Sequence, residues 1–316
     1  MDPEIVNRLR CPVCAGTLAP ATAGTAHALR CPHGHSFDVA RQGYVNLLAG
    51  RTPHAGDSAA MVAARADFLA AGHYDVVSSA LADAAARALA KHRPAVGPPT
   101  SPADPVPADP VPADPTPTGT VSTGGAYPLV VEPGAGTARH LAAVLAARPD
   151  AVGLALDVSK PALRRAARAH PRAGAALADT WQRLPLADAS VAVLLNVFAP
   201  RNGAEFHRIL DPAGTLLVVT PVAEHLAELV DALDLLRVDP AKAERVAGSL
   251  AGHFTETGTT EHRARLTLTR PEVETLVGMG PSAWHADPTR LAARIAALAE
   301  PVTVTVAVRL SRYRPA

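Results

Sequence analysis

Residues 128–137, PLVVEPGAGT, decide the fold of this chain of 316 residues. A short apolar run ends at Glu132, and two glycines, Gly134 and Gly136, follow before a helical pattern begins. Glycines allow a sharp turn and a close approach to a ligand, and the free N–H groups at the start of a helix can bind that ligand. The stretch therefore predicts a buried strand, a ligand-binding turn and a helix.

Strand and helix patterns continue to alternate after this turn. Further strands are expected at 151–157, 175–179, 190–198, 214–221, 262–270 and 302–314. Helices are expected between them at 138–149, 159–171, 204–210, 223–236 and 271–280. This alternation specifies a parallel sheet with helices on both faces. We predict an α/β, Rossmann-like fold with a mixed seven-stranded sheet whose last strand is antiparallel.

Two cofactors use a glycine turn followed by an acidic residue at the end of the next strand, here Asp157. Dinucleotides favour GxGxxG, and the third glycine is missing. S-adenosylmethionine has a ribose and no phosphate, and its loop has the form acidic-x-Gly-x-Gly, which Glu132, Gly134 and Gly136 fit. A tight structural turn is the simpler alternative. The predicted adenosylmethionine contacts are Glu132, Gly134, Gly136, Thr137, Asp157, Asp179 and Thr180.

The segment NVFAP, from Asn196 to Pro200, follows the fourth expected strand. Ligands of open α/β sheets lie at the carboxyl ends of the strands, so this segment is placed where a methyl acceptor would meet its donor. Asn196 and Phe198 are therefore the candidate catalytic residues, Phe198 by stacking. The alternative is that Asn196 caps a turn and Phe198 belongs to the core.

The N-terminal region carries all three cysteines. Cys11 and Cys14 form one Cys-x2-Cys turn, and Cys31 begins the second turn, CPHGHSF. Four-coordinate zinc needs one more ligand, and by spacing alone either His33 or His35 could supply it. Three free thiols are the alternative. Four protein ligands would leave no open position, so such a zinc ion would be structural.

Composition limits the remaining possibilities. The net charge of +1 provides no strong global attraction to nucleic acid or membrane, although basic residues cluster from Arg164 to Arg172. No apolar run approaches a membrane span, and the N-terminus lacks the apolar region of a signal peptide, so we expect a cytoplasmic protein that contacts no membrane. Residues 93–127 are rich in proline and contain the repeat PADPV, which predicts a disordered linker or insertion.

Several motifs occur in an order that resembles one known family. They are CPVC, CPHGHSFDVARQGYVNLL, GDSAAMVAARADFLAAGHY, EPGAGT, LDVSKPALRRAARAHP, RLPLADASV, NVFAPRN and TPVAEHLAEL. The chain resembles the 23S ribosomal RNA guanine-N1-methyltransferases, and within them the Gram-positive branch that includes the tylosin-resistance methyltransferase. The resemblance covers nearly all of the chain except the proline-rich segment.

The resemblance implies a class I methyltransferase that modifies a guanine in hairpin 35 of 23S ribosomal RNA, near the macrolide tunnel, and acts as a homodimer with an RNA cleft. It implies zinc bound by Cys11, Cys14, Cys31 and His35. It also implies that Tyr74 and His225 help to bind S-adenosylmethionine, whereas the residue pattern alone suggests a core tyrosine and a surface histidine.

The organisation expected from pattern and resemblance has four parts. Residues 1–50 form a zinc-binding RNA-recognition module, 51–92 connecting helices, 93–127 the proline-rich segment, and 128–316 the methyltransferase domain. RNA phosphates would meet Arg41, Arg51 and Arg65, each of which could equally be a solvated surface charge.

The family loop has the form D-x-G-x-G-x-G, and this chain departs from it twice, because Glu132 replaces the aspartate and Ala138 the last glycine. Two other functions therefore remain as alternatives. One is a small-molecule methyltransferase of antibiotic biosynthesis. The other is a non-catalytic, zinc-stabilised RNA-binding or resistance module that has lost the donor site.

Overall fold

The computed structural model describes residues 1–23, 26–50, 56–92, 127–237, 239, 241–280 and 287–316. The predictions for Arg51 and for the proline-rich segment, apart from Tyr127, lie outside these residues.

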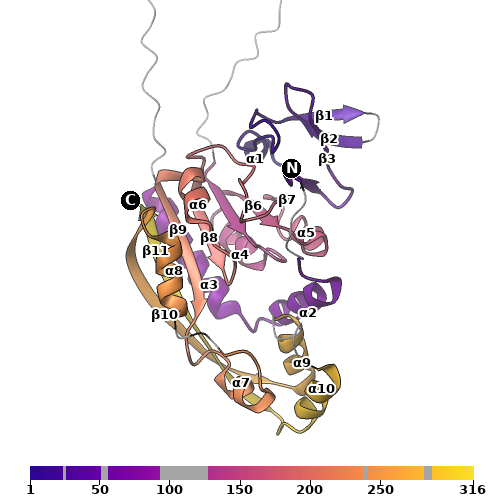
Figure 1. The fold of residues 1–316 in the computed structure, drawn as a ribbon, viewed down its shortest axis with the longest axis vertical. Helices are drawn as coiled ribbons and strands as arrows, with labels where there is room; N and C mark the ends of the chain where they lie inside the picture. The colour runs from indigo at the N-terminus through magenta and orange to yellow at the C-terminus, as the bar shows by residue number, and fades with distance from the viewer. Residues whose placement is uncertain (24–25, 51–55, 93–126, 238, 240, 281–286) are drawn as a thin grey trace, which may run out of the picture.

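The main sheet of the described chain has the strand order β10-β11-β9-β8-β5-β6-β7-β4 (Figure 1). Its strands are β4 (Tyr44–Asn46), β5 (Leu129–Pro133), β6 (Val152–Asp157), β7 (Ala173–Leu177), β8 (Val191–Val197), β9 (Leu210–Pro221), β10 (Phe254–Leu268) and β11 (Val302–Pro315). The strands from β9 to β4 run parallel, and β11 is antiparallel to both of its neighbours. The predicted α/β fold is confirmed, and so is its antiparallel last strand.

The expected count of seven strands is wrong by one, because β4 from the N-terminal region joins the edge of the sheet. Tyr44, Val45 and Asn46 pair in parallel with Ala175, Ala176 and Leu177 of β7. Tyr44 and Val45 are buried there. A strand of three residues has too little pattern to reveal its partner from sequence, so only its burial in the fold identifies it.

The strand β5 is buried on both faces, as its continuous apolar sequence predicts. Val130 belongs to one hydrophobic cluster, and its neighbours Leu129 and Val131 belong to the other. Successive side chains of a strand point to opposite faces, so these are the two sides of the sheet. The glycine turn therefore starts from a rigid, fully enclosed strand.

Ten helices of the described residues accompany the two sheets. They are α1 (Pro3–Val6), α2 (Ala59–Ala70), α3 (Asp75–Lys91), α4 (Arg139–Ala147), α5 (Lys160–Ala166), α6 (Gly203–Ile209), α7 (Ala227–Leu233), α8 (Lys242–Leu250), α9 (Arg270–Gly278) and α10 (Pro288–Ala296). The connecting segment forms the two helices α2 and α3, with Gly72 at a φ of 84° in the turn between them. No described helix is long and apolar enough to span a membrane.

The helix expected at 223–236 is shorter in the structure, where α7 covers only Ala227–Leu233. Leu226 and Asp234, which flank it, both have a left-handed φ of 57°. Such a conformation interrupts a right-handed helix, and the apolar periodicity of the sequence does not reveal it. His225 is thereby released from the helix into the turn that precedes it.

Helices α2, α9, α10 and α7 contact one another in that order and form a lobe at the lower end of the molecule (Figure 1). This lobe lies beyond the carboxyl ends of β5 and β6. The N-terminal region lies at the other end of the sheet, where β1 (Ala19–Ala23), β2 (Ala26–Arg30) and β3 (Ser36–Asp38) form a small antiparallel sheet.

Gly153→Ala should destabilise the fold, because α4 packs on β6 at this glycine. An added Cβ would lie 2.7 Å from Leu145 Cδ1 and 3.0 Å from Leu141 Cδ1, and both leucines are fully buried. Overpacking of this kind costs about 1–3 kcal/mol of unfolding free energy, which urea unfolding measures.

Gly248→Ala in α8 is the matched control, because no atom lies within 4 Å of its added Cβ. It should be neutral or stabilising by up to about 1 kcal/mol, since alanine is the better helix former. Equal unfolding free energies for the two variants would contradict the tight packing of α4 on β6.

Candidate functional site

A cavity of about 810 Å³ lies at the carboxyl ends of the parallel strands. The turns after β5, β6, β7 and β8 form one wall, and side chains of α2, α7 and α9 form the other. A cavity of this size is typical of a site for a cofactor or a small ligand. Of the predicted site residues, it is lined by Tyr74, Glu132, Gly134, Gly136, Asp157, Asp179, Thr180, Phe198 and His225.

The glycine turn has the backbone conformation that the sequence predicted. Gly134, Gly136 and Ala138 have φ values of 70°, 54° and 58°. A Cβ on Gly134 would lie 2.6 Å from Ala199 Cβ, so the segment after β8 passes directly over this turn. Ala138 adopts a left-handed conformation that glycine would adopt freely.

Asp157 connects the glycine turn to the following helix. Its Oδ2 accepts the N–H of Gly136 at 2.8 Å, and its Oδ1 accepts the N–H of Ser159 at 2.8 Å. Burial raises the pKa of Asp157, and these two backbone hydrogen bonds oppose the shift. The carboxylate lies at the cavity wall, where it can accept ribose hydroxyls while it fixes both turns.

Glu132 has a role in the structure that its sequence motif does not show. Its side chain is almost completely buried, and Oε2 accepts the N–H of Leu141 in the first turn of α4 at 3.1 Å. Burial raises the pKa of Glu132 to about 8. The Glu132 side chain thus caps the first turn of α4. With this pKa the carboxyl group is largely neutral at pH 7, although it lies beside the glycine turn.

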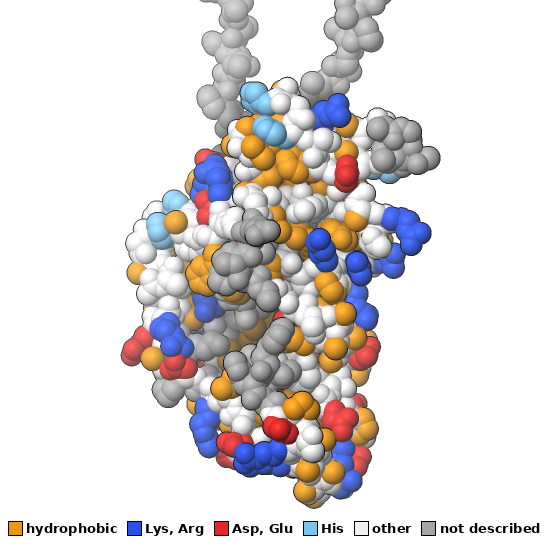
Figure 2. All heavy atoms as spheres, turned by 45° about the vertical axis from the view of Figure 1, so that its right-hand side comes forward, with side chains coloured by type: hydrophobic (Ala, Val, Ile, Leu, Met, Phe, Trp, Pro, Cys, Tyr) orange, Lys and Arg blue, Asp and Glu red, His pale blue; other side chains and the backbone are white. Residues whose placement is uncertain are grey.

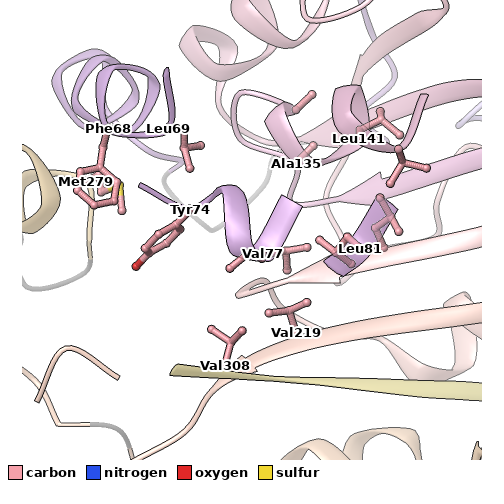
Figure 3. Packing of buried hydrophobic residues seen from close by; sticks show 14 of the residues in the cluster. Phe68, Leu69, Tyr74, Val77, Leu81, Ala135, Leu141, Val219, Met279 and Val308 are labelled. Carbon is pink, nitrogen blue, oxygen red and sulfur yellow. The ribbon is translucent and has the colours of Figure 1, made fainter. Parts of the chain in front are cut away.

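Tyr74, Phe198 and His225 come together from three distant segments. Tyr74 Oη lies 3.2 Å from His225 Nε2, and the Phe198 ring centroid lies 6.2 Å and 5.9 Å from the rings of Tyr74 and His225. Figure 3 shows the hydroxyl end of Tyr74 pointing away from the buried side chains of Val77 and Leu81. We call these three residues the aromatic cluster.

The hydrogen bonds of His225 fix its tautomer. The N–H of Ala307 donates to Nδ1 at 3.2 Å, so a neutral ring carries its proton on Nε2 and donates it to Tyr74 Oη. Burial raises the pKa of Tyr74 far above its ordinary value of 10. Tyr74 therefore stays a phenol and has its own proton to donate to a ligand in the cavity.

Asn196 does not reach the cavity wall. It is fully buried, its Nδ2 donates to the carbonyl of Pro200 at 2.8 Å, and its Oδ1 accepts from Arg201 at 3.1 Å. These contacts agree with the alternative interpretation, in which Asn196 caps the turn after β8. Phe198, by contrast, is 41% exposed at a left-handed φ of 52°, so the structure does not place it in the core.

Two other predicted residues, Asp179 and Thr137, are buried near the cavity. Asp179 is buried, and its Oδ1 accepts the N–H of Trp181 at 3.0 Å. Thr137 is buried within the glycine turn but does not line the cavity.

Arg65 and His140 are among the cavity residues that sequence reasoning did not assign to the site. Arg65 is ion-paired with Asp57, donates to the carbonyl of Met279 and lies against Gly136, whereas an RNA phosphate was expected to hold it. His140 contacts Ser78 Oγ at 3.0 Å, and burial lowers its pKa to about 4.

The structure gathers Cys11, Cys14, Cys31 and His35, whose potential ligand atoms all lie within 4.8 Å of one another. Tetrahedral zinc with Zn–S bonds of ~2.3 Å needs sulfur atoms ~3.8 Å apart. Cys14 Sγ and Cys31 Sγ are 3.7 Å apart, and His35 Nδ1 is 3.3 Å from Cys31 Sγ. Although burial raises it, hydrogen bonds from His35 lower the pKa of the Cys31 thiol to about 6, which favours the thiolate that zinc requires.

Two knuckle turns shape this group. Ala15 N–H donates to the carbonyl of Cys11, and Gly34 N–H donates to that of Cys31. His33, the other candidate ligand, contacts Cys14 Sγ at 3.4 Å but is exposed and falls outside the four-residue group. The donor set and its spacing fit a structural zinc ion.

Comparison with known proteins agrees with both parts of the structure. Residues 9–52 match the zinc-ribbon family described as "RlmA, N-terminal". A protein of Micromonospora griseorubida, "Putative 23S rRNA (guanine-N(1)-)-methyltransferase", is 66% identical over 316 residues, 100% of both chains. The "23S rRNA (guanine(748)-N(1))-methyltransferase" of Streptomyces fradiae is 48% identical over 315 residues, 100% of this chain and 99% of its own length.

This chain belongs to the 23S rRNA (guanine-N1)-methyltransferases. A Bacillus subtilis protein whose name also assigns this activity is 26% identical over 294 residues, 90% of each chain. The methyltransferase uses S-adenosylmethionine as its methyl donor and carries a structural zinc ion, so the cofactors expected from the sequence are confirmed.

The cavity of this methyltransferase fits its methyl donor. Gly134 and Gly136 line the cavity after β5, and a carboxylate, Asp157, lines it at the end of β6. Gly136 has a left-handed φ of 54°, which glycine adopts without strain, and a Cβ there would lie 3.2 Å from Arg65 Nη1. The two departures from the family loop are accommodated in this structure as a helix-capping side chain, Glu132, and a left-handed turn residue, Ala138.

Glu132→Gln should stabilise the methyltransferase increasingly as the pH rises. The pKa of Glu132 is about 8 in the folded state and near 4.5 when unfolded, so between these values the folded state holds a proton that the unfolded state has released. Wild-type stability therefore falls as the pH rises from about 5 to 8, whereas glutamine, which keeps an acceptor oxygen for Leu141, removes this loss.

Urea unfolding at pH 5, 6, 7 and 8 tests this expectation, and the advantage of the variant at pH 8 should reach at least about 1 kcal/mol. Glu261→Gln is the control, because hydrogen bonding to Arg309 lowers the pKa of that carboxyl, so the folded and unfolded states differ little in its protonation from pH 5 to 8 and its curve should run nearly parallel to that of wild type. Parallel pH curves for wild type and Glu132→Gln would show that Glu132 is ionised in the folded protein.

His35→Ala should lose zinc, whereas His33→Ala should keep it. Removal of one of four ligands opens the site, and the thiolates of Cys11, Cys14 and Cys31 alone bind more weakly. Mass spectrometry of the metal content per chain measures the difference. Full zinc content in His35→Ala, together with zinc loss in His33→Ala, would show that His33 is the fourth ligand. Either result alone would contradict the assignment of His35.

Proposed function

We propose that this protein transfers the methyl group of S-adenosylmethionine to N1 of a guanine in hairpin 35 of 23S rRNA. One observation carries the proposal: the glycine turn with Asp157 and the aromatic cluster line the same cavity. A donor site and a site for a flat, aromatic acceptor are thereby within reach of each other. The whole-length similarity to guanine-N1-methyltransferases supports this choice of acceptor.

Phe198 is the residue best placed to hold the acceptor base. Its exposed ring leaves the end of β8 in a left-handed conformation, and it faces Tyr74 and His225. Guanine N1 lies on the pairing edge, so the base must leave its pair and stack before it can react. Stacking of one base on an aromatic ring contributes about 1–3 kcal/mol, which helps to offset that cost.

The other site residues act by positioning. When bound, S-adenosylmethionine supplies an electrophilic methyl group on a sulfonium. Asp157 would accept the ribose hydroxyls, and Tyr74 would donate its phenol proton to the carboxylate of the methionine moiety. Asn196 holds the backbone of Pro200 and the side chain of Arg201, and thereby fixes the direction of the Phe198 ring. Orientation of this kind can account for much of the rate of a two-substrate reaction.

Neither Tyr74 nor His225 is suited to remove the N1 proton. Tyr74 is protonated because burial raises its pKa, and the Nε2 atom of His225 that faces the cluster carries a proton in the neutral ring. Both atoms act as donors in this geometry, so the aromatic cluster offers no base for the N1 proton.

We extend further expectations from the family resemblance and from a named relative to this chain. The target is the guanine named for the Streptomyces fradiae relative, guanine 748. Its methylation would give macrolide resistance of the tylosin type. The protein would work as a homodimer, with residues 1–50 as its RNA-recognition module, and in the cytoplasm, where its ribosomal substrate is made.

A labelling experiment tests the proposed reaction. The protein is incubated with tritiated S-adenosylmethionine and unmodified 23S rRNA, and the labelled nucleotide is mapped by mass spectrometry. Label on N1 of a hairpin 35 guanine is expected. Label that enters only a small-molecule extract would favour an antibiotic-biosynthesis methyltransferase, and calorimetry without adenosylmethionine binding would favour a non-catalytic module.

Phe198→Ala should lower kcat/KM for the RNA about 10- to 100-fold, which corresponds to the loss of one stacking contact. Phe198→Tyr keeps the ring and is the matched control, with an expected change below about threefold. Adenosylmethionine affinity, measured by calorimetry, should change little in either variant, because Phe198 is assigned to the acceptor. Equal kcat/KM values for Phe198→Ala and wild type would remove Phe198 from the acceptor site.

A further inference from the structure

A basic segment that the proposed reaction does not use runs from Val158 to Ala178. It contains Lys160, Arg164, Arg165, Arg168 and Arg172 but no aspartate or glutamate. In a chain with a net charge of only +1, this is a strong local excess of positive charge. Its placement in the fold decides whether it is merely a solvated surface.

Helix α5 divides this segment into an apolar and a basic face. Ala162, Leu163 and Ala166 are buried against the sheet. Lys160, Arg164, Arg165 and Arg168 are exposed. Lys160 and Arg164 are four residues apart and lie along one side of the helix, and Arg168 lies in the turn that follows the helix.

The exposed cations of α5 and of the turn after it have no carboxylate partner among the described residues. Some exposed arginines elsewhere have a carboxylate partner. Arg139 pairs with Asp75 at 3.1 Å, and Arg237 pairs with Asp231 at 2.8 Å. Arg172 is different again, because its guanidinium donates to the carbonyls of Leu145, Arg148 and Ala151 and so supports the fold. The unpaired set is therefore Lys160, Arg164, Arg165 and Arg168, which we call the α5 basic face.

The α5 basic face connects the two parts of the molecule that concern RNA. At one end, the turn from Ala40 to Tyr44 carries the exposed Arg41, and a Cβ on Gly43 would lie 3.5 Å from Ala167 Cβ, next to Arg168. At the other end, Ser159 caps α5 and donates its N–H to Asp157 at the cavity wall. Figure 2, which turns the α5 side of Figure 1 toward the viewer, shows Lys and Arg side chains gathered on this flank.

We propose that the α5 basic face, continued by Arg41, binds the phosphate backbone of the 23S rRNA hairpin and guides it from the zinc-binding module to the cavity. This inference rests on the proposed function, because it takes the rRNA as the substrate. Lys160, Arg164, Arg165 and Arg168 present unpaired positive charge along α5 and the turn that follows it, and successive phosphates of an RNA strand can neutralise such a row of charges. Arginine is well suited to such contacts, since its planar guanidinium binds phosphate oxygens in pairs.

The test is the full-length triple variant Arg164→Gln, Arg165→Gln, Arg168→Gln. Its affinity for an unmodified 23S rRNA fragment with hairpin 35 should fall roughly 10- to 100-fold at ~0.1 M salt, and the slope of log Kd against log salt should decrease by about 2–3. Fluorescence anisotropy at several KCl concentrations measures both. Adenosylmethionine affinity, the melting temperature and kcat at saturating RNA should stay at wild-type values, because none of these residues lines the cavity.

A second triple variant, Arg87→Gln, Arg263→Gln, Arg265→Gln, removes the same charge from exposed positions on α3 and β10. It should change the affinity less than about threefold. An equal loss of affinity in both variants would show that only total charge matters and would overturn the proposed path. If the wild type methylates N1 but the α5 variant keeps the wild-type salt dependence of RNA affinity, the proposed path is also overturned. A wild type that does not methylate the RNA would instead overturn the proposed function, and this inference with it.

Discussion

The buried carboxylate of Asp157 is the constraint on which the site depends. It accepts backbone N–H groups from the glycine turn and from the start of α5, so the ends of β5 and β6 are held in one geometry. Burial makes the pair of hydrogen bonds stronger than it would be in water, and loss of the carboxylate would leave two donors without these acceptors. The same group faces the cavity, and therefore one residue both shapes the donor site and belongs to it.

Patterns that repeat along the chain predicted most of the fold. The alternation of apolar strands with amphipathic helices gave the parallel sheet, because both structures leave a clear periodicity in the sequence. Short or strained pieces escaped prediction. β4 has only three residues, and α7 is limited by Leu226 and Asp234, whose left-handed conformations have no signature in the residue types. Helices α8 and α10 also formed where no helix was expected.

The candidate site was predicted partly from local sequence motifs and partly from the family resemblance. Local motifs identified the glycine turn, Asp157 and the cysteine pair, since each depends on neighbours in the sequence. The approach of Tyr74 to His225 joins residues that are 151 positions apart, so only the family resemblance indicated both, and the structure brings them together. The roles of Glu132 and Asn196 depend on burial and on single backbone contacts, which no spacing rule reports.

The pairing of β4 with β7 links the zinc site to the edge of the main sheet. The chain that forms the zinc site continues within a few residues into the strand that covers the edge of β7. Structural zinc stabilises the module that it holds, and an uncovered parallel strand edge is a template for association with other chains. Zinc starvation would therefore act on this enzyme as a fault of assembly, with aggregation through an exposed β7, before any chemistry at the cavity was affected.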